Sequence, residues 1–197
     1  MGRSKLRLMQ RDYSGALLGF EDSLSVVERN CGPDGFEAGL ILLDIGGADH
    51  LLQRNTAAER SYRRALTIFD KGGSRGIESG AIARIFLAKL LMLDRRMTEA
   101  EALFEQAITV LQSSGNQDRA YLAGARINLA EAYRTDGRYA KAEPLYRSVL
   151  DMVQGQPSLR TPDITLGLAQ FPSMLHKMKR KAEARAFRQQ IQPLLSE

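Results

Sequence analysis

Few side chains in the sequence are spaced for catalysis or metal binding. The two histidines, His50 and His176, stand far apart in the chain, and neither has a second His or Cys at metal-ligand spacing. Asp49 and His50 are adjacent, so on a helix their side chains point in different directions. The chain contains no Gly-x-Ser-x-Gly, His-Glu-x-x-His or paired-carboxylate pattern. We therefore predict no enzyme activity, no metal site and no cofactor.

Two further features suggest structure more than chemistry. The run Gly72–Gly76 is rich in glycine but lacks the spacing of a phosphate-binding loop and follows a helical pattern, so we interpret it as a linker. The single Cys31 cannot form an internal disulfide, so nothing indicates secretion. No apolar run approaches the length that spans a membrane, and the N-terminus lacks a hydrophobic signal core. We expect a cytoplasmic protein with no membrane contact.

The charge of the chain bears on its partners. The net charge of +5 mildly favours acidic ones. One dense basic patch runs from His176 to Lys181, with Arg185 and Arg188 beyond it. A solvated end of the fold explains this patch most simply, and contact with an acidic partner or RNA is the alternative. Because no long basic stripe of the kind that binds nucleic acid is present, we expect a protein or peptide partner and not nucleic acid.

A period of 42 residues organises the elements that carry these side chains. Alanine recurs at this spacing, and an aromatic residue follows four positions later in the first four units. A small residue also recurs in the preceding helical pattern. The aligned positions are Ala16, Ala58, Ala100, Ala142 and Ala184; Phe20, Tyr62, Phe104 and Tyr146; and Gly46, Ala88 and Ala130. Small residues opposite large rings allow two helices to pack closely. The alternative, an ordinary amphipathic bundle, requires no constant spacing.

The helical patterns are separated by Gly, Pro and Ser breaks, and no segment alternates with period two. We therefore predict an all-α fold, an α-solenoid of about five stacked antiparallel helix pairs that form a single domain without a sheet. The predicted pairs cover approximately residues 1–32, 36–73, 77–115, 117–155 and 161–197.

Three residues refine the packing within these pairs. Gly46 occupies the small packing position, so the close approach of a neighbouring helix explains it. Gly47 has no such role, and an internal glycine costs a helix up to ~1 kcal/mol relative to alanine. Pro172 lies inside the predicted first helix of the last pair, where we expect a kink or a late helix start.

The ends of the chain look like the ends of a repeat array. Such a repeat cannot bury its apolar face alone, so the end units need polar outer faces. In the last unit Lys181 and Arg188 replace aromatic residues. The first unit lacks the opening turn of its first helix, which predicts either a degenerate cap or a chain cut from a longer protein. Its exposed Leu6, Leu8 and Met9 favour a homo-oligomer formed through this N-terminal hairpin, or contact with missing upstream repeats.

The stretch Ile127–Leu150 carries the repeat most clearly. Leu129, Ala130 and Tyr133 form one apolar stripe, and Gly137 follows as a turn residue before the second stripe. This stretch resembles a tetratricopeptide repeat, in particular the longer kinesin-light-chain type, whose units read LxNLAxxYxxxGRYxEAEPLYxRAL. The resemblance extends over nearly the whole chain and implies an α-solenoid that binds protein partners.

The resemblance also implies a concave binding face made by the first helix of each pair. In kinesin-light-chain-type repeats an Asn of the first helix commonly holds the backbone of a bound peptide, and an amide suits this because it both donates and accepts. Here only Asn128 keeps that residue, which argues against a regular asparagine ladder. The implied positions are Asp44, His50, Phe86, Lys89, Met92, Asn128, Glu131, Arg134 and Gln170. They are part apolar and part charged, which suits an amphipathic segment; alternatively, they only pack between repeats or contact water.

These patterns lead to a non-catalytic interaction scaffold that binds a peptide or a partner helix in its concave groove. One alternative is a regulatory segment of a larger enzyme or transcription regulator. Another is a helical-repeat RNA binder, which the period disfavours because such repeats are usually shorter and read one base each.

Overall fold

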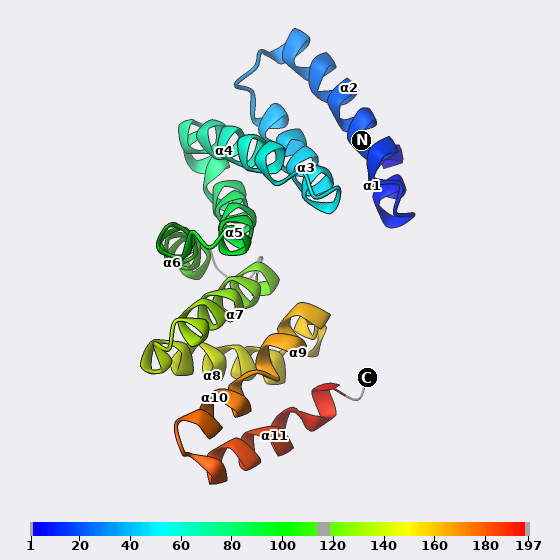
Figure 1. Cartoon of the computed structure of the whole chain (residues 1–197). Helices are drawn as coiled ribbons and strands as arrows, with labels where there is room; N and C mark the ends of the chain where they lie inside the picture. Colours follow the sequence, from blue (N-terminus) through cyan, green and yellow to red (C-terminus); the bar gives the residue numbers. More distant parts are fainter. Residues whose placement is uncertain (1, 114–118, 196–197) are drawn as a thin grey trace. The chain divides into compact units, whose positions relative to one another are not determined.

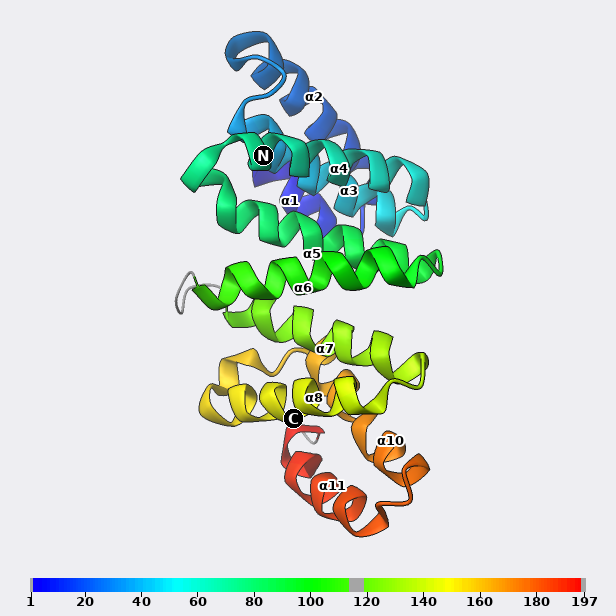
Figure 2. The same cartoon turned by 90° about the vertical axis from the view of Figure 1, so that its left-hand side faces the viewer.

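The computed structural model describes residues 2–113 and 119–195. Within these ranges the chain forms helices and short 3-10 turns, and no strand (Figures 1 and 2). The elements are α1 (Gly2–Met9), α2 (Tyr13–Cys31), α3 (Phe36–Leu51), α4 (Asn55–Lys71), η1 (Gly73–Gly76), α5 (Ile77–Leu93), α6 (Met97–Ser113), α7 (Arg119–Thr135), α8 (Tyr139–Gly155), η2 (Pro157–Leu159), α9 (Pro162–Leu168), α10 (Phe171–Lys177) and α11 (Lys181–Leu195). The predicted all-α fold is confirmed.

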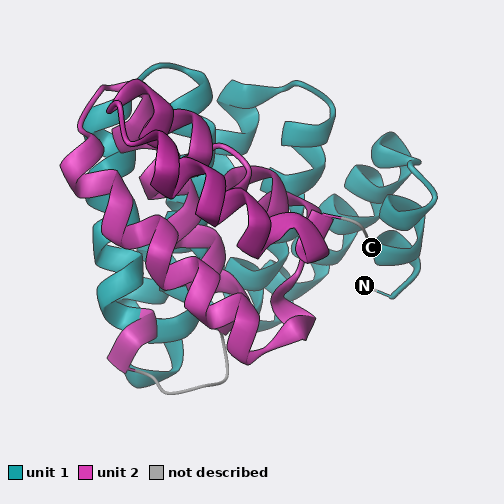
Figure 3. Ribbon diagram, turned by 90° about the horizontal axis from the view of Figure 1, so that it is seen from below, with its two compact units in different colours: residues 1–110 teal, residues 111–197 magenta. Residues whose placement is uncertain are grey.

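The chain divides into two compact units, residues 1–110 and 111–197 (Figure 3). In unit 1, α2 contacts both α1 and α3, and α4 contacts both α3 and α5, so the helices from α1 to α5 each pack on the next along the chain. In unit 2, α7 packs on α8, and α10 packs on α11. The single domain and the exact limits of its five pairs stay predictions, and the predicted boundary near residues 115–117 lies outside the described residues.

Every helix pair closes through the same left-handed turn. At these turns a residue with positive φ recurs every 42 positions, at Arg11 (62°), Gln53 (62°), Arg95 (61°), Gly137 (74°) and Lys179 (63°). At each turn the next N–H donates to the carbonyl five residues earlier, as from Arg54 to Asp49 and from Arg138 to Tyr133, both at 2.8 Å. A non-glycine residue in this conformation costs roughly 1–2 kcal/mol, so four of the five turns are held by the packing of the helices they join.

The repeated small and aromatic side chains form the core of each pair. The recurrent alanines are 0% exposed at Ala16, Ala58, Ala100 and Ala142, and 3% exposed at Ala184. The aromatic residues that follow them are equally buried, whereas Arg188 at the same position of the last pair is exposed. The buried alanine and aromatic residue predicted from the period are therefore present in the first four pairs, whereas the last pair keeps the alanine and carries an exposed arginine.

The two adjacent glycines of α3 differ as predicted. A Cβ on Gly46 would lie 2.5 Å from a ring carbon of Tyr62, so only glycine allows α4 to approach this closely. A Cβ on Gly47 would meet nothing nearer than the Tyr62 hydroxyl, at 3.9 Å, which is an ordinary contact.

The first helix of the last pair is split, as Pro172 predicted. Helix α9 ends at Leu168, and α10 begins at Phe171 with Pro172 in its first turn, where the missing N–H has no intrahelical acceptor to lose. Phe171 then stacks on Tyr146 with ring centres 4.9 Å apart and meets the edge of Phe187 at 4.6 Å. The break thus places an aromatic cluster at the centre of unit 2.

A network of four charges joins successive second helices in each unit. In unit 1, Glu59 accepts from Arg63 and from Arg96, both at 2.8 Å, and Glu99 pairs with both arginines. Unit 2 repeats the arrangement 84 residues later with Glu143, Arg147, Arg180 and Glu183. Hydrogen bonds from Arg180 lower the pKa of the Glu143 carboxyl. Networks of this kind hold position better than isolated surface pairs do.

The glycine pair of α3 gives a matched test of this packing. We expect Gly46→Ala to lower the free energy of unfolding by about 1–3 kcal/mol, because the added methyl group clashes with the Tyr62 ring. We expect Gly47→Ala to raise it by up to ~1 kcal/mol through helix propensity. Urea denaturation followed by circular dichroism measures both, and a loss of stability in Gly47→Ala would contradict this account.

Candidate partner-binding surface

The residues implied by the resemblance fall into two groups, one in each unit. Unit 1 carries five of them on α3 and α5, and unit 2 carries four on α7 and at the α9–α10 junction. The first group is Asp44, His50, Phe86, Lys89 and Met92, and the second is Asn128, Glu131, Arg134 and Gln170. All are half-buried except Gln170, which is exposed and lies in the break between two helices. Half-burial of the other eight fits residues that line a surface between packed helices.

In unit 1 two contacts bring side chains of this group against neighbouring helices. The Asp44 carboxylate of α3 forms an ion pair with the Lys5 ammonium of α1 at 3.4 Å. Burial raises the pKa of the Asp44 carboxyl, and Lys5 partly offsets that rise. Phe86 of α5 stacks on Tyr62 of α4, with ring centres 5.8 Å apart. An acidic and an aromatic side chain therefore stand one repeat apart on equivalent positions of α3 and α5.

Next to this group lies a carboxylate whose burial the sequence analysis did not predict. Asp49 is 5% exposed, and its nearest cation is Arg54, at 4.0 Å. At the equivalent positions of the three later repeats stand Leu91, Tyr133 and Leu175, all of them buried. Burial is the main cause that raises the pKa of the Asp49 carboxyl. In the sequence, Asp49 is recognisable as unusual when it is compared with the residues 42, 84 and 126 positions later.

His50 adds a second poorly satisfied group to the same turn. Its Nδ1 atom is buried and has no hydrogen-bond partner within residues 2–113 and 119–195. The α3–α4 turn thus combines an acidic side chain in an apolar position with an imidazole nitrogen that is not satisfied there.

In unit 2 the group forms a connected cluster on α7. Glu131 accepts from the Arg134 guanidinium at 2.7 Å and from the hydroxyl of Tyr146 on α8. Burial raises the pKa of Tyr146, and its hydrogen bond to Glu131 raises it further. Asn128 donates its amide N–H to the Gly124 carbonyl at 2.6 Å, and its side-chain oxygen makes no hydrogen bond within the described residues. One acceptor therefore remains on Asn128 for a partner.

Unit 1 also contains a pocket that sequence reasoning missed. Its volume is about 630 Å³, within the range of sites for small molecules. The Arg84 guanidinium crosses it, donating to Asp70 at 2.7 Å and to Gln106 at 3.1 Å. The lining residues are Phe69, Asp70, Gly73, Gly76, Ile77, Arg84, Ala102, Glu105, Gln106, Thr109 and Val110. The available signal was Arg84 itself, one of two cations in the largely apolar sequence of α5.

The linker Gly72–Gly76 shapes this pocket. It forms a 3-10 turn that folds back on α4, and a Cβ on Gly76 would lie 1.9 Å from the Phe69 carbonyl oxygen. Glycine is therefore required for the return of the chain, in agreement with a linker and not a phosphate-binding loop.

Two classes of site are absent from residues 2–113 and 119–195. No group of three or more His, Cys, Asp or Glu residues there is arranged to hold a metal ion. In the same part of the chain no helix combines the length and the apolar character needed to cross a bilayer.

Comparison with known proteins agrees with this geometry. The family model described as tetratricopeptide repeat matches residues 81–154. No curated protein sequence matches the chain significantly. Residues 81–154 are therefore similar to tetratricopeptide repeats.

Three solved structures are similar in fold to this chain. BtubC from P. vanneervenii is 18% identical with a TM-score of 0.83, over 98% of this chain and 77% of that one. The nearly identical TPR-like repeats of a kinesin-light-chain-type protein from Podosopora anserina are 14% identical with a TM-score of 0.77, over 99% and 92%. The Rap conjugation gene regulator of plasmid pLS20, solved with the Phr* peptide, is 16% identical with a TM-score of 0.70, over 95% and 50%. At these identities the likeness establishes the fold alone, an α-solenoid.

The buried carboxylate gives a prediction about pH. We expect Asp49→Leu, which introduces the residue found at positions 91 and 175, to stabilise the protein by about 1–3 kcal/mol near neutral pH. The pKa of the Asp49 carboxyl is higher in the folded than in the unfolded protein. The charged carboxylate therefore lowers the free energy of unfolding at pH values above the raised pKa. This destabilisation disappears as the pH falls toward 3.8, the ordinary pKa of an aspartate. The difference in free energy of unfolding between the variant and the wild type should therefore become smaller at acidic pH.

Thermal melts at a series of pH values measure this gap. The isosteric variant Asp49→Asn controls for volume and should show the same narrowing. A gap that stays constant from neutral to acidic pH would show that packing, and not charge, is responsible.

The Glu131–Tyr146 hydrogen bond gives a second prediction. We expect Glu131→Ala to lower the free energy of unfolding by about 1–3 kcal/mol, because the buried Tyr146 hydroxyl loses its acceptor. Glu131→Gln keeps an acceptor oxygen and should lose less than half as much. Urea titration compares the two variants, and equal losses would argue against the hydrogen bond as the cause.

Proposed function

We propose that this chain is a non-catalytic scaffold that binds a peptide or a partner helix along the first helices of its repeats. Tetratricopeptide folds generally mediate protein–protein interaction. The observation that carries the proposal is the half-burial of eight of the nine implied positions, which leaves polar and apolar side chains accessible at regular spacing. The predicted cytoplasmic location stays a prediction.

The side chains suggest how a partner would be held. In unit 2 the free oxygen of Asn128 accepts a backbone N–H of an extended segment, and Arg134 lies six residues further along the same helix. In unit 1 Phe86 and Met92 offer apolar contact on α5. A segment with alternating apolar and polar residues matches this combination, and the net charge of +5 favours acidic side chains among the polar ones.

The solved relatives support a peptide as the partner class. The Rap regulator was solved with the Phr* peptide, and this chain covers 50% of it. That relation also supports the alternative in which these repeats act as the regulatory segment of a larger enzyme or transcription regulator. In both cases the repeats themselves bind and do not catalyse.

A peptide selection tests the proposal. We expect phage-displayed random peptides panned against the full chain to yield binders that share a spacing of apolar and acidic residues. The affinity of these peptides, measured by fluorescence anisotropy, should fall at least tenfold for the double variant Asn128→Ala/Arg134→Ala, equivalent to about 1.4 kcal/mol. The binding should not depend on any catalytic turnover of the peptide.

The matched control is Arg84→Ala, which alters the pocket of unit 1 and leaves α7 untouched. Circular dichroism melts confirm that all variants fold. Full affinity in the Asn128/Arg134 variant together with lost affinity in Arg84→Ala would place the peptide in the pocket and overturn the assignment to the first helices.

A further inference from the structure

An uncovered stacking face lies on α1 and α2 in unit 1. Leu6 of α1 is 54% exposed, whereas its equivalents in the four later repeats, Ala48, Leu90, Ala132 and Met174, are at most 1% exposed. Ala48 belongs to the apolar cluster that α3 forms with α2. Leu6 therefore occupies the position with which a first helix packs on a preceding second helix.

Helix α2 continues the same face. The equivalent of Asp22 on the next second helix is Arg64, which reaches back to Glu28 of α2 at 2.6 Å. The side of α2 that carries Asp22 is therefore the side that faces away from α3. Leu18, one turn before Asp22 on this side, is 63% exposed. Leu6 thus marks a surface suited to helix packing, and Leu18 enlarges its apolar area; we call this surface the N-terminal face.

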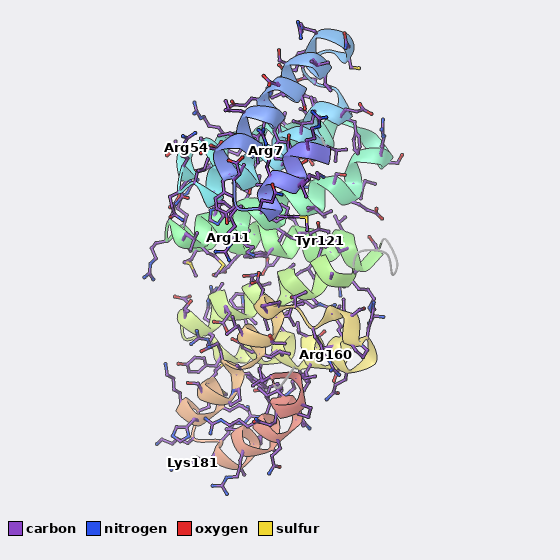
Figure 4. The ribbon with its side chains drawn as sticks, turned by 90° about the vertical axis from the view of Figure 1, so that its right-hand side faces the viewer. Arg7, Arg11, Arg54, Tyr121, Arg160 and Lys181 are labelled. Atoms are coloured by element: carbon purple, nitrogen blue, oxygen red, sulfur yellow. The ribbon has the colours of Figure 1, made fainter. Side chains whose placement is uncertain are left out.

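Charges on the N-terminal face complement one another. Arg3 of α1 takes the position of the buried residues Ile45, Leu87, Leu129 and Phe171, and it is exposed. Within the described residues neither Arg3 nor Asp22 forms an ion pair, whereas Arg7 of the same hairpin, labelled in Figure 4, already pairs with Asp12. A cation on α1 and an acid on α2 are therefore both available to a partner.

The other end of the repeat array does not supply the partner for this face. Helix α11 presents an exposed polar side with Arg185, Arg188 and Gln189, and Lys181, labelled in Figure 4, stands at its start. Such a surface cannot bury Leu6 and Leu18, so a head-to-tail contact between copies is disfavoured. A second N-terminal face offers what α11 lacks, because it combines exposed leucines with a cation and an acid that form no ion pair within the described residues.

We propose that two copies of this chain associate through their N-terminal faces into a weak, reversible twofold dimer. The contact rests on Leu6 and Leu18 at its centre and on two symmetric Arg3–Asp22 pairs at its rim. It does not depend on the proposed peptide binding, because it uses neither the residues of α7 nor those of α5.

Sedimentation velocity of the full chain tests the proposal. We expect a concentration-dependent shift from monomer to dimer with a dissociation constant on the order of 10 μM, as for a small interface. Leu18→Glu should weaken association at least tenfold. The control Leu166→Glu changes a leucine of α9 that is equally exposed, at 64%, and should leave association unchanged.

Charge reversal adds a test that loss of folding cannot imitate. Arg3→Glu and Asp22→Arg should each weaken self-association, and an equimolar mixture of the two should restore the dimer, because each copy then offers the charge that the other needs. A monomer at every concentration, growth beyond the dimer, or a dimer that Leu166→Glu dissolves and Leu18→Glu does not would each overturn the proposal.

Discussion

The fit of a small side chain against an aromatic ring sets the distance between the helices of the first four pairs, and the rest of the structure depends on it. Gly46 and the recurrent alanines bring the two helices so close that a single added methyl group at Gly46 would enter the Tyr62 ring. This distance is why one turn geometry recurs every 42 residues, even where Arg11, Gln53 or Arg95 must adopt a left-handed backbone. At these turns helix packing outweighs the preference of non-glycine residues for a negative φ.

Electrostatic interactions reinforce this spacing without creating it. The four-charge network that joins α4 to α6 returns 84 residues later between α8 and α11, with the same residue types at the same positions. Its members lie at the surface, so their main effect is to fix the rotation of one second helix against the next. Asp49 shows the opposite case, because a carboxylate in a position that is otherwise apolar works against the core.

The surfaces relevant to binding arise where the repeats depart from their own pattern. Asn128 differs from Asp44 and Phe86 at equivalent positions, Arg84 crosses a pocket in an apolar helix, and Leu6 is exposed where its equivalents are buried. A regular repeat makes a uniform scaffold, so specificity can come only from such departures. The period is therefore useful twice, first to recognise the fold and then to find the positions that break its rule.

The sequence by itself determined the helices, their pairing and the packing residues, because a constant period places the same side chain in the same environment each time. It also determined that Gly46 is needed for close approach and that Pro172 delays a helix, since both effects are local to the backbone. Only the tertiary structure decided that Gln170 falls in a break, that Asp49 is buried beside Arg54, and that the turn after α4 leaves a pocket around Arg84. These outcomes depend on which side chains of different helices pack against one another and which stay in contact with solvent. A sequence pattern does not specify these contacts.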